Sequence, residues 1–200
     1  KFRESGFLQI HPGSKSYITL SDASGKKNVA AIINKVKNSL EDFVEIDPVV
    51  YWQSTVGIIR QLLAESNISP ENIKALAFSS QGETMICLDD QGKPLRNAIV
   101  WMDNRSHSQA ETMKKDWSPQ SILEKTGQPE ILPLWPATRI KWLKEHEPEI
   151  FRKTHKFLLV ADYLLFMLTG EYASEQSLVS STLYYDIINK CYWDDMLDYL

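Results

Sequence analysis

The most constraining feature of this chain is a series of short apolar runs in its middle third, each followed by polar or turn residues. Three runs have the length and flanking residues of β-strands: Lys74–Phe78, Met85–Leu88 and Asn97–Val100. The Asp-Asp-Gln-Gly sequence at 89–92 predicts the turn between the last two. Polar clusters at 79–84 and 101–105 then stand at strand ends, where an α/β fold can bring them together.

These clusters hold side chains that suit a small polyhydroxylated molecule. The predicted substrate-binding residues are Gln81, Glu83, Trp101, Asp103 and Arg105. Four of them can form hydrogen bonds, and the indole offers an apolar surface. Binding sites for small molecules commonly combine a few convergent polar groups with aromatic walls.

Each of these residues also has a purely structural interpretation. Glu83 could be a surface hairpin residue, and Gln81 a strand-end residue that also lines the pocket. Asp103 could cap a helix that starts near residue 106. Arg105 could pair with Asp103 or Glu83, and Trp101 could belong to the core. The sequence leaves these alternatives open.

The N-terminal part predicts strands and one long helix. Phe7–Ile10 and Tyr17–Leu20 flank a glycine turn and predict a hairpin, whereas Asn28–Val36 fits either a strand or a short helix. Asp47 is a good N-cap and Pro48 fits the first position of a helix that runs to about residue 65. Its expected buried face comprises Val49, Trp52, Val56, Ile59, Leu62 and Leu63.

After Arg105 the pattern changes from strands to helices. The predicted helices are Ser106–Lys115, Ser118–Lys125, Thr138–Glu145, Pro148–Arg152, Val160–Leu168 and Asp194–Leu200. Strands first and helices after predict one compact α/β unit. The pattern is still helical at Leu200, so the natural protein is expected to continue.

Composition excludes several classes of protein. The 200 residues have a net charge of −4 and no basic block, so neither nucleic acid nor an anionic membrane is an expected partner. No apolar run is long enough to span a bilayer and no signal peptide is recognised, so a cytoplasmic location is expected. Cys87 lies within an apolar run and predicts a buried thiol rather than a disulfide with Cys191. No grouping of His, Cys, Asp and Glu has metal-ligand spacing, so no structural metal is predicted.

A set of motifs resembles the N-terminal domain of the FGGY carbohydrate kinases, which include xylulokinase, glycerol kinase and gluconate kinase. The resemblance covers residues 7–200, in the family's order and at compatible spacings. Its motifs are Glu45–Pro48, Ser79–Gln81, Gly92–Leu95, Trp101–Arg105, Thr126–Gly127, Lys141–Leu143, His146–Glu149, Asp162–Leu164 and Leu168–Glu171.

The resemblance implies a ribonuclease H-like, actin-like α/β fold with a mixed central sheet. It implies transfer of the ATP γ-phosphoryl group, with Mg²⁺, to a hydroxyl of a small sugar, polyol or sugar acid. The second, nucleotide-binding domain and the general base would lie beyond residue 200, so this chain alone is expected to be inactive. Glu83 would accept hydrogen bonds from substrate hydroxyls, and Gly13, Ser14 and Lys15 would meet the nucleotide phosphates. A homodimer is left open.

The first hairpin departs from the family pattern. The family carries an aspartate that organises the metal ion, and His11 stands at that place here. Neutral imidazole is a poor replacement for a hard oxygen ligand of Mg²⁺. Two other functions therefore stay open: a catalytically impaired sugar-sensing or interaction module, and an actin-like scaffold unrelated to sugars. The scaffold would not need Glu83, Trp101, Asp103 and Arg105 to converge.

Overall fold

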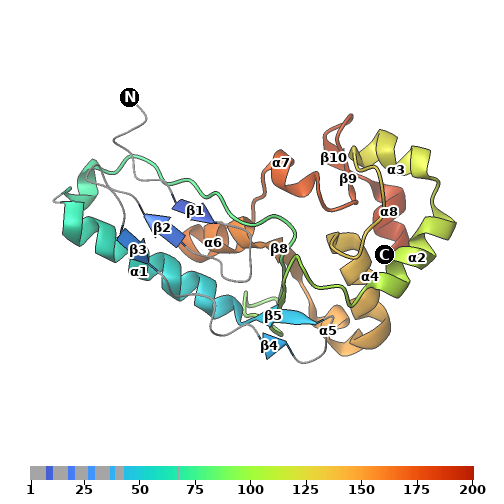
Figure 1. Cartoon of the computed structure of the whole chain (residues 1–200), viewed down its shortest axis with the longest axis horizontal. Coiled ribbons are helices and arrows are strands. Elements are labelled where there is room, and N and C mark those ends of the chain that lie inside the picture. The colour runs from blue at the N-terminus through green and yellow to red at the C-terminus, as the bar shows by residue number, and fades with distance from the viewer. Residues whose placement is uncertain (1–7, 11–17, 21–26, 30–36, 39–42, 67) are drawn as a thin grey trace.

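The computed structural model describes residues 8–10, 18–20, 27–29, 37–38, 43–66 and 68–200. A five-stranded antiparallel sheet lies between two groups of helices (Figure 1). Its strands, in spatial order, are β4 (Lys37–Asn38), β5 (Val44–Ile46), β7 (Ala98–Ile99), β6 (Met85–Leu88) and β8 (Lys156–Leu159). The predicted strands at 85–88 and 97–100 are therefore confirmed, and the two are neighbours.

Strand β6 is buried on both faces, because each face of the sheet is covered by a hydrophobic core. Successive side chains of a strand point to opposite sides of the sheet, so they enter different cores. Met85 and Cys87 belong to one hydrophobic core, and Ile86 and Leu88 belong to another. This explains why the strand is an unbroken apolar run rather than an alternating one. Cys87 is 1% exposed, which confirms the predicted buried thiol.

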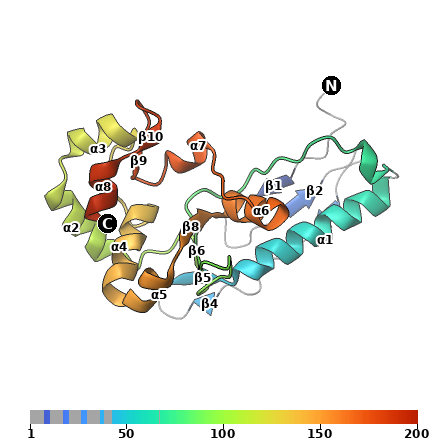
Figure 2. The ribbon, with the colours of Figure 1, turned by 180° about the vertical axis from the view of Figure 1, so that it is seen from behind.

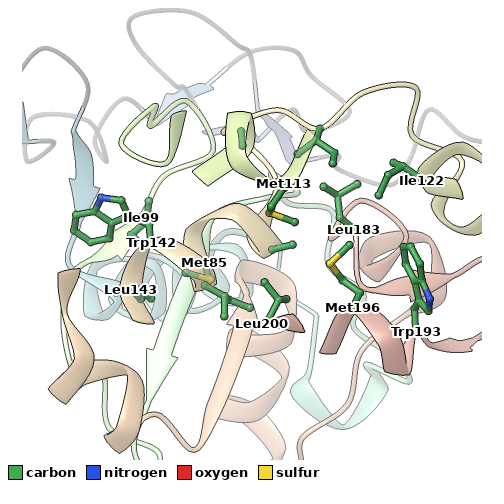
Figure 3. Packing of buried hydrophobic residues seen from close by; sticks show 14 of the residues in the cluster. Met85, Ile99, Met113, Ile122, Trp142, Leu143, Leu183, Trp193, Met196 and Leu200 are labelled. Carbon is green, nitrogen blue, oxygen red and sulfur yellow. The ribbon is translucent and has the colours of Figure 1, made fainter. Parts of the chain in front are cut away.

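The first core, partly shown in Figure 3, packs one face of the sheet against helices. Those helices are α2 (His107–Asp116), α3 (Pro119–Thr126), α4 (Pro136–His146) and α8 (Asp194–Tyr199). Ser118 caps α3 by accepting a hydrogen bond from the Ser121 amide at 3.0 Å, and Gly127 ends it with φ +72°. The short helix α5 (Pro148–Lys153) follows α4.

The second core lies between the other face of the sheet and two helices, α1 (Pro48–Ser66) and α6 (Val160–Thr169). The views from opposite sides show α1 and α6 side by side (Figures 1 and 2). Asp47 accepts a hydrogen bond from the Val49 amide at 2.9 Å, which confirms its predicted capping role. Within the described residues, no helix has the length and apolarity needed to cross a membrane.

The expected buried face of α1 is wrong over much of its length. Only Pro48 is fully buried in this helix, and Val49 and Leu62 are 38% and 40% exposed. The helix contributes to the second core through Val50, Tyr51 and Trp52 in its first turns and then extends past the sheet (Figure 1). Apolar periodicity predicts which face of a helix faces inward, but not how far its neighbours extend along it.

The predicted N-terminal hairpin is confirmed in its strands. β1 (Leu8–Ile10) pairs antiparallel with β2 (Ile18–Leu20), which pairs with β3 (Lys27–Val29). β3 settles the choice between strand and helix for its described residues in favour of a strand. His11, Gly13, Ser14 and Lys15 lie outside the described residues.

The strand predicted at Lys74–Phe78 is wrong. After the 3₁₀ turn η2 (Pro70–Asn72), the backbone has no regular structure up to residue 84. Ile73 and Leu76 are 47% and 53% exposed. A strand needs a hydrogen-bonding neighbour, and this segment does not join any described strand.

Several short elements were not predicted from the sequence. The residues just before the Asp47 cap form β5, and the first residues of the apolar run that continues into α6 form β8. The Asp162 carboxylate accepts a hydrogen bond from the Leu159 amide at 3.1 Å, where strand changes to helix. The other elements missed are β4, η2, α7 (Gln176–Val179), β9 (Tyr185–Asp186) and β10 (Cys191–Tyr192).

Candidate functional site

The register of the sheet brings the two polar clusters together. Met85 of β6 pairs with Ile99 of β7 in antiparallel register, so Glu83, two residues before β6, and Trp101, two residues after β7, adjoin the same end of this strand pair. Thr84, fully buried, fixes this approach: its hydroxyl accepts a hydrogen bond from the Trp101 amide at 3.1 Å. Residues 79–84 and 101–105 therefore meet at the ends of two interior strands of the sheet.

Arg139 of α4 joins the two clusters from within the protein. Its Nη1 donates to the Glu83 carbonyl oxygen at 2.6 Å, and its Nη2 donates to those of Trp101 at 2.7 Å and Asp103 at 3.2 Å. The side chain is 0% exposed. Burial lowers the pKa of the guanidinium to about 10, so the group remains a cation at neutral pH.

Arg139 was missed by the sequence reasoning, although the sequence carries a signal for it. The apolar stripe of α4 runs through Pro136, Ile140 and Leu143, all buried, and Arg139 stands within that stripe. A charged residue in the buried stripe of a helix needs internal partners, because burying an unsatisfied charge is costly.

The carboxylate of Glu83 is free to accept hydrogen bonds from a ligand, as far as the described residues show. Its side chain is half-buried, and none of the described residues donates a hydrogen bond to it. The indole of Trp101 is also half-buried and packs at the margin of the second core. An acceptor and an aromatic side chain therefore come from two backbone segments that Thr84 and Arg139 hold together.

Gln81 is anchored to the first turns of α1. Its Nε2 donates to the phenolic oxygen of Tyr51 at 2.5 Å. Burial raises the pKa of Tyr51, although hydrogen bonds with Gln81 and Thr84 oppose that rise. The phenol therefore stays protonated at neutral pH. This contact holds the irregular segment that carries Glu83 against the helix.

Asp103 and Arg105 form an ion pair within the protein. Asp103 is 0% exposed, and its Oδ1 and Oδ2 accept from Arg105 Nε and Nη2 at 2.9 and 2.8 Å. Oδ2 also accepts from the Val44 amide at 2.5 Å. Of the structural alternatives, pairing of Arg105 with Asp103 is observed, whereas the N-cap residue of α2 is Ser106 rather than Asp103.

Further charges surround this pair. Arg105 Nη2 lies 2.7 Å from Glu45 Oε1, and the guanidinium lies over the rings of Phe43 and Trp142 at 4.1 and 4.9 Å from their centroids. Burial lowers the pKa of Arg105, but the hydrogen bonds and charges of Asp103 and Glu45 outweigh it and raise the pKa. Arg105 is thus a fixed cation with its charge balanced internally.

The segment after α7 also borders the first polar cluster. A Cβ built on Gly82 would have Ser181 Oγ, 3.9 Å away, as its nearest neighbour. Ala137 donates its amide hydrogen to the Thr182 carbonyl at 3.1 Å, which ties this segment to the start of α4. Ser181 was not predicted at the site, because about a hundred residues separate it from Gly82 in the sequence.

A model of the N-terminal domain of the FGGY family of carbohydrate kinases matches residues 17–200. The chain belongs to the FGGY family. This confirms the resemblance drawn from the sequence motifs.

Relatives within the FGGY family include kinases for different substrates. The chain is 34% identical over 177 residues to a probable L-xylulose kinase of Pasteurella multocida, covering 84% of this chain and 35% of that protein. It is 35% identical over 161 residues to a glycerol kinase of Thermococcus onnurineus, covering 78% and 32%. The chain thus spans about a third of the length of these curated relatives.

A solved FGGY kinase structure shares the fold. The ligand-bound xylulose kinase of Lactobacillus acidophilus superposes with a TM-score of 0.79 at 25% identity, over 93% of this chain and 37% of that one. The predicted ribonuclease H-like, actin-like α/β fold is confirmed, but the expected mixed central sheet is wrong for the described strands, which all pair antiparallel. Among the described residues of this FGGY chain, no three His, Cys, Asp or Glu side chains gather to hold a metal ion.

Proposed function

We propose that this chain is the sugar-binding part of an ATP-dependent carbohydrate kinase. Its substrate would be a small sugar, polyol or sugar acid, phosphorylated on a hydroxyl group. The observation that carries this proposal is a Glu83 carboxylate that receives no hydrogen bond from the described residues, in a backbone segment tied to that of Trp101. The relatives described above, a probable L-xylulose kinase and a glycerol kinase, support this substrate class.

Within this proposal the predicted site residues have two kinds of role. Glu83 accepts hydrogen bonds from substrate hydroxyls, Trp101 offers its face to the carbon skeleton, and Gln81 lines the site while bonded to Tyr51. The side chains of Asp103 and Arg105 are committed to one another. We propose that they support the backbone behind the substrate, in place of the direct contacts expected from the sequence.

The nucleotide would be bound by other parts of the protein. Gly13, Ser14 and Lys15, together with a second domain, are proposed to hold ATP and its Mg²⁺, which supply the phosphoryl group and neutralise its charge. The described residues do not themselves form such a metal site. Their part is to bind and orient the sugar, because phosphoryl transfer depends mainly on positioning and electrostatic stabilisation.

Ligand binding to the Glu83→Gln variant tests the site. The substitution keeps the size of the side chain but removes its charge, and a hydrogen bond to a charged group contributes about 1.5–3 kcal/mol. We expect the dissociation constant for the best sugar of a panel of pentuloses, hexuloses, polyols and aldonates to rise at least about tenfold by calorimetry.

Glu149→Gln is the matched control, because Glu149 is exposed on α5 and, among the described residues, forms an ion pair with Arg152 alone. It should bind like the wild type. Binding by Glu83→Gln at wild-type affinity would refute the assigned site. Wild-type sugar binding with no phosphorylation by the intact natural protein would favour the sugar-sensing module over the kinase.

A further inference from the structure

We propose that Arg139 is the positioning residue of this site and that it sets the distance and orientation between Glu83 and Trp101. This inference rests on the proposed sugar site and deepens it. Arg139 does not contact the sugar itself. It acts through the backbone of the two residues that do.

The geometry of the guanidinium supports this role. The group is planar and rigid, and its two terminal nitrogens point to separate segments of backbone. Nη1 holds the carbonyl of Glu83, whereas Nη2 holds those of Trp101 and Asp103. One side chain therefore fixes both polar clusters in a common frame, across the end of the β6–β7 pair.

The contacts are directed at the two residues that the proposal assigns to the sugar. The Glu83 side chain receives no hydrogen bond from the described residues, so its position depends on its backbone. The Trp101 backbone is held on both sides: its amide bonds to Thr84 and its carbonyl to Arg139. Loss of the guanidinium would leave three backbone carbonyls at the site, those of Glu83, Trp101 and Asp103, without this donor.

Arg139 is also poorly suited to a role in stability alone. It is fully buried, and its Nε has no hydrogen-bond partner among the described residues. Burial lowers its pKa, and the like charge of Arg105 lowers it further, while the charges of Asp103 and Glu83 oppose both effects. The desolvation penalty of a buried cation is large, and hydrogen bonds to neutral carbonyls offset it less than an ion pair would, so stability alone does not account for Arg139.

The experiment compares Arg139→Lys and Arg139→Met in the intact natural kinase. Arg139→Met keeps an unbranched apolar side chain but removes every donor, and Arg139→Lys keeps the charge but cannot span carbonyls on two segments with a planar fork. We expect the KM for the sugar to rise about tenfold or more in Arg139→Met, with an unchanged KM for ATP. Arg139→Lys should recover part of that loss.

Two control variants separate positioning from stability. Ile122→Ala removes core volume in α3, and Ile122 is 1% exposed, so this variant should lose thermal stability while keeping the sugar KM. Arg152→Met removes an exposed arginine and should change neither. An unchanged sugar KM in Arg139→Met, or an equal rise in Ile122→Ala, would overturn the proposal.

Hydrogen–deuterium exchange gives a readout that does not depend on activity. In both Arg139 variants, exchange should rise in peptides covering 81–84 and 101–105 more than in the peptide covering α3. Wild-type exchange in these peptides of Arg139→Lys, together with a wild-type sugar KM, would overturn the role even if Arg139→Met did not fold. A wild-type protein that neither binds nor phosphorylates sugars would instead refute the proposed function, and local exchange would still show whether Arg139 orders the two clusters.

Discussion

At the scale of single residues, buried charged side chains hold the backbone at the ends of β6 and β7 in place. Asp103 lies between two arginines: its carboxylate pairs with Arg105 and its carbonyl accepts from Arg139. The ion pair continues through Glu45, which Arg96 also contacts. Buried ion pairs do not necessarily add net stability, but removing one partner is strongly destabilising, because the other charge remains buried.

Asp103→Asn should therefore destabilise the protein severely. The variant leaves the buried Arg105 guanidinium with Glu45 as its remaining charged partner, and breaking a buried pair costs about 3–5 kcal/mol. For a chain of this length, that corresponds to a fall in Tm of roughly 10 °C in calorimetry. Glu149→Gln breaks the exposed pair with Arg152 and should cost less than about 1 kcal/mol. Equal losses in the two variants would mean that the Asp103 pair carries no special weight.

The sequence predicted that the polar clusters at 79–84 and 101–105 would approach each other, because both adjoin the strands that the turn at 89–92 connects. Glu83 and Trp101 could be paired in advance from the turn between 88 and 97. Ser181 and Arg139 could not, because their approach depends on how α4 and the segment after α7 pack on the sheet. The state of Asp103 was also open, since a carboxylate two residues before an arginine can face either that arginine or a ligand.

At the scale of elements, turns and caps were predicted better than strand pairing. The Asp-Asp-Gln-Gly turn has Gly92 at φ +75°, and Asp89 Oδ1 accepts from the Gln91 and Lys93 amides at 2.9 and 2.8 Å. Such turn chemistry is local, so the sequence specifies it. The strand predicted at 74–78 depends on a distant partner, and the same apolar residues without one form an exposed, irregular segment.

Alanine substitutions at two glycines should have opposite effects. Gly92→Ala would place a Cβ in the left-handed region and against the Phe166 ring, so it should cost about 2 kcal/mol. Gly57 lies in the helix α1 with nothing within 4 Å of a built Cβ, so Gly57→Ala should stabilise by about 0.5–1 kcal/mol. Urea denaturation of the two variants measures both changes. A stabilising Gly92→Ala would contradict the observed turn.

At the scale of the whole molecule, two cores share one sheet. The first core joins the sheet to α2, α3, α4 and α8, and the second joins it to α1 and α6 (Figures 1 and 3). The α/β class followed from periodicity, but the expected order of strands first and helices after is wrong, because β8, β9 and β10 follow helices. The division into two cores did not follow from periodicity, because it depends on which helices cross to which face.

The stability of the molecule should fall in acid partly through Asp186. Amides of Asn189 and the Lys125 ammonium hold the pKa of this carboxyl below its usual range. A carboxyl with a lowered folded-state pKa stabilises the fold above its unfolded pKa, about 3.9, and loses that contribution as the pH falls further. The difference in unfolding free energy between wild type and Asp186→Asn should therefore be constant above about pH 5 and shrink below pH 4.

Lys125→Met is the companion variant, because it removes one of the groups that lower this pKa and leaves the backbone amides in place. Its difference from the wild type should also shrink in acid, but by less. Differences that stay constant down to pH 2 for both variants would show that Asp186 does not contribute to acid sensitivity.

The alternation of β6 has a consequence for errors in folding. A slip of one residue against β7 would exchange the side chains that enter the two cores, since successive positions face opposite ways. The same slip would move Glu83 away from Trp101 and from the guanidinium that holds both. A sheet in the wrong register would thus pack poorly in both cores and would also lose its ligand site. Correct pairing of β6 and assembly of the site therefore depend on the same register.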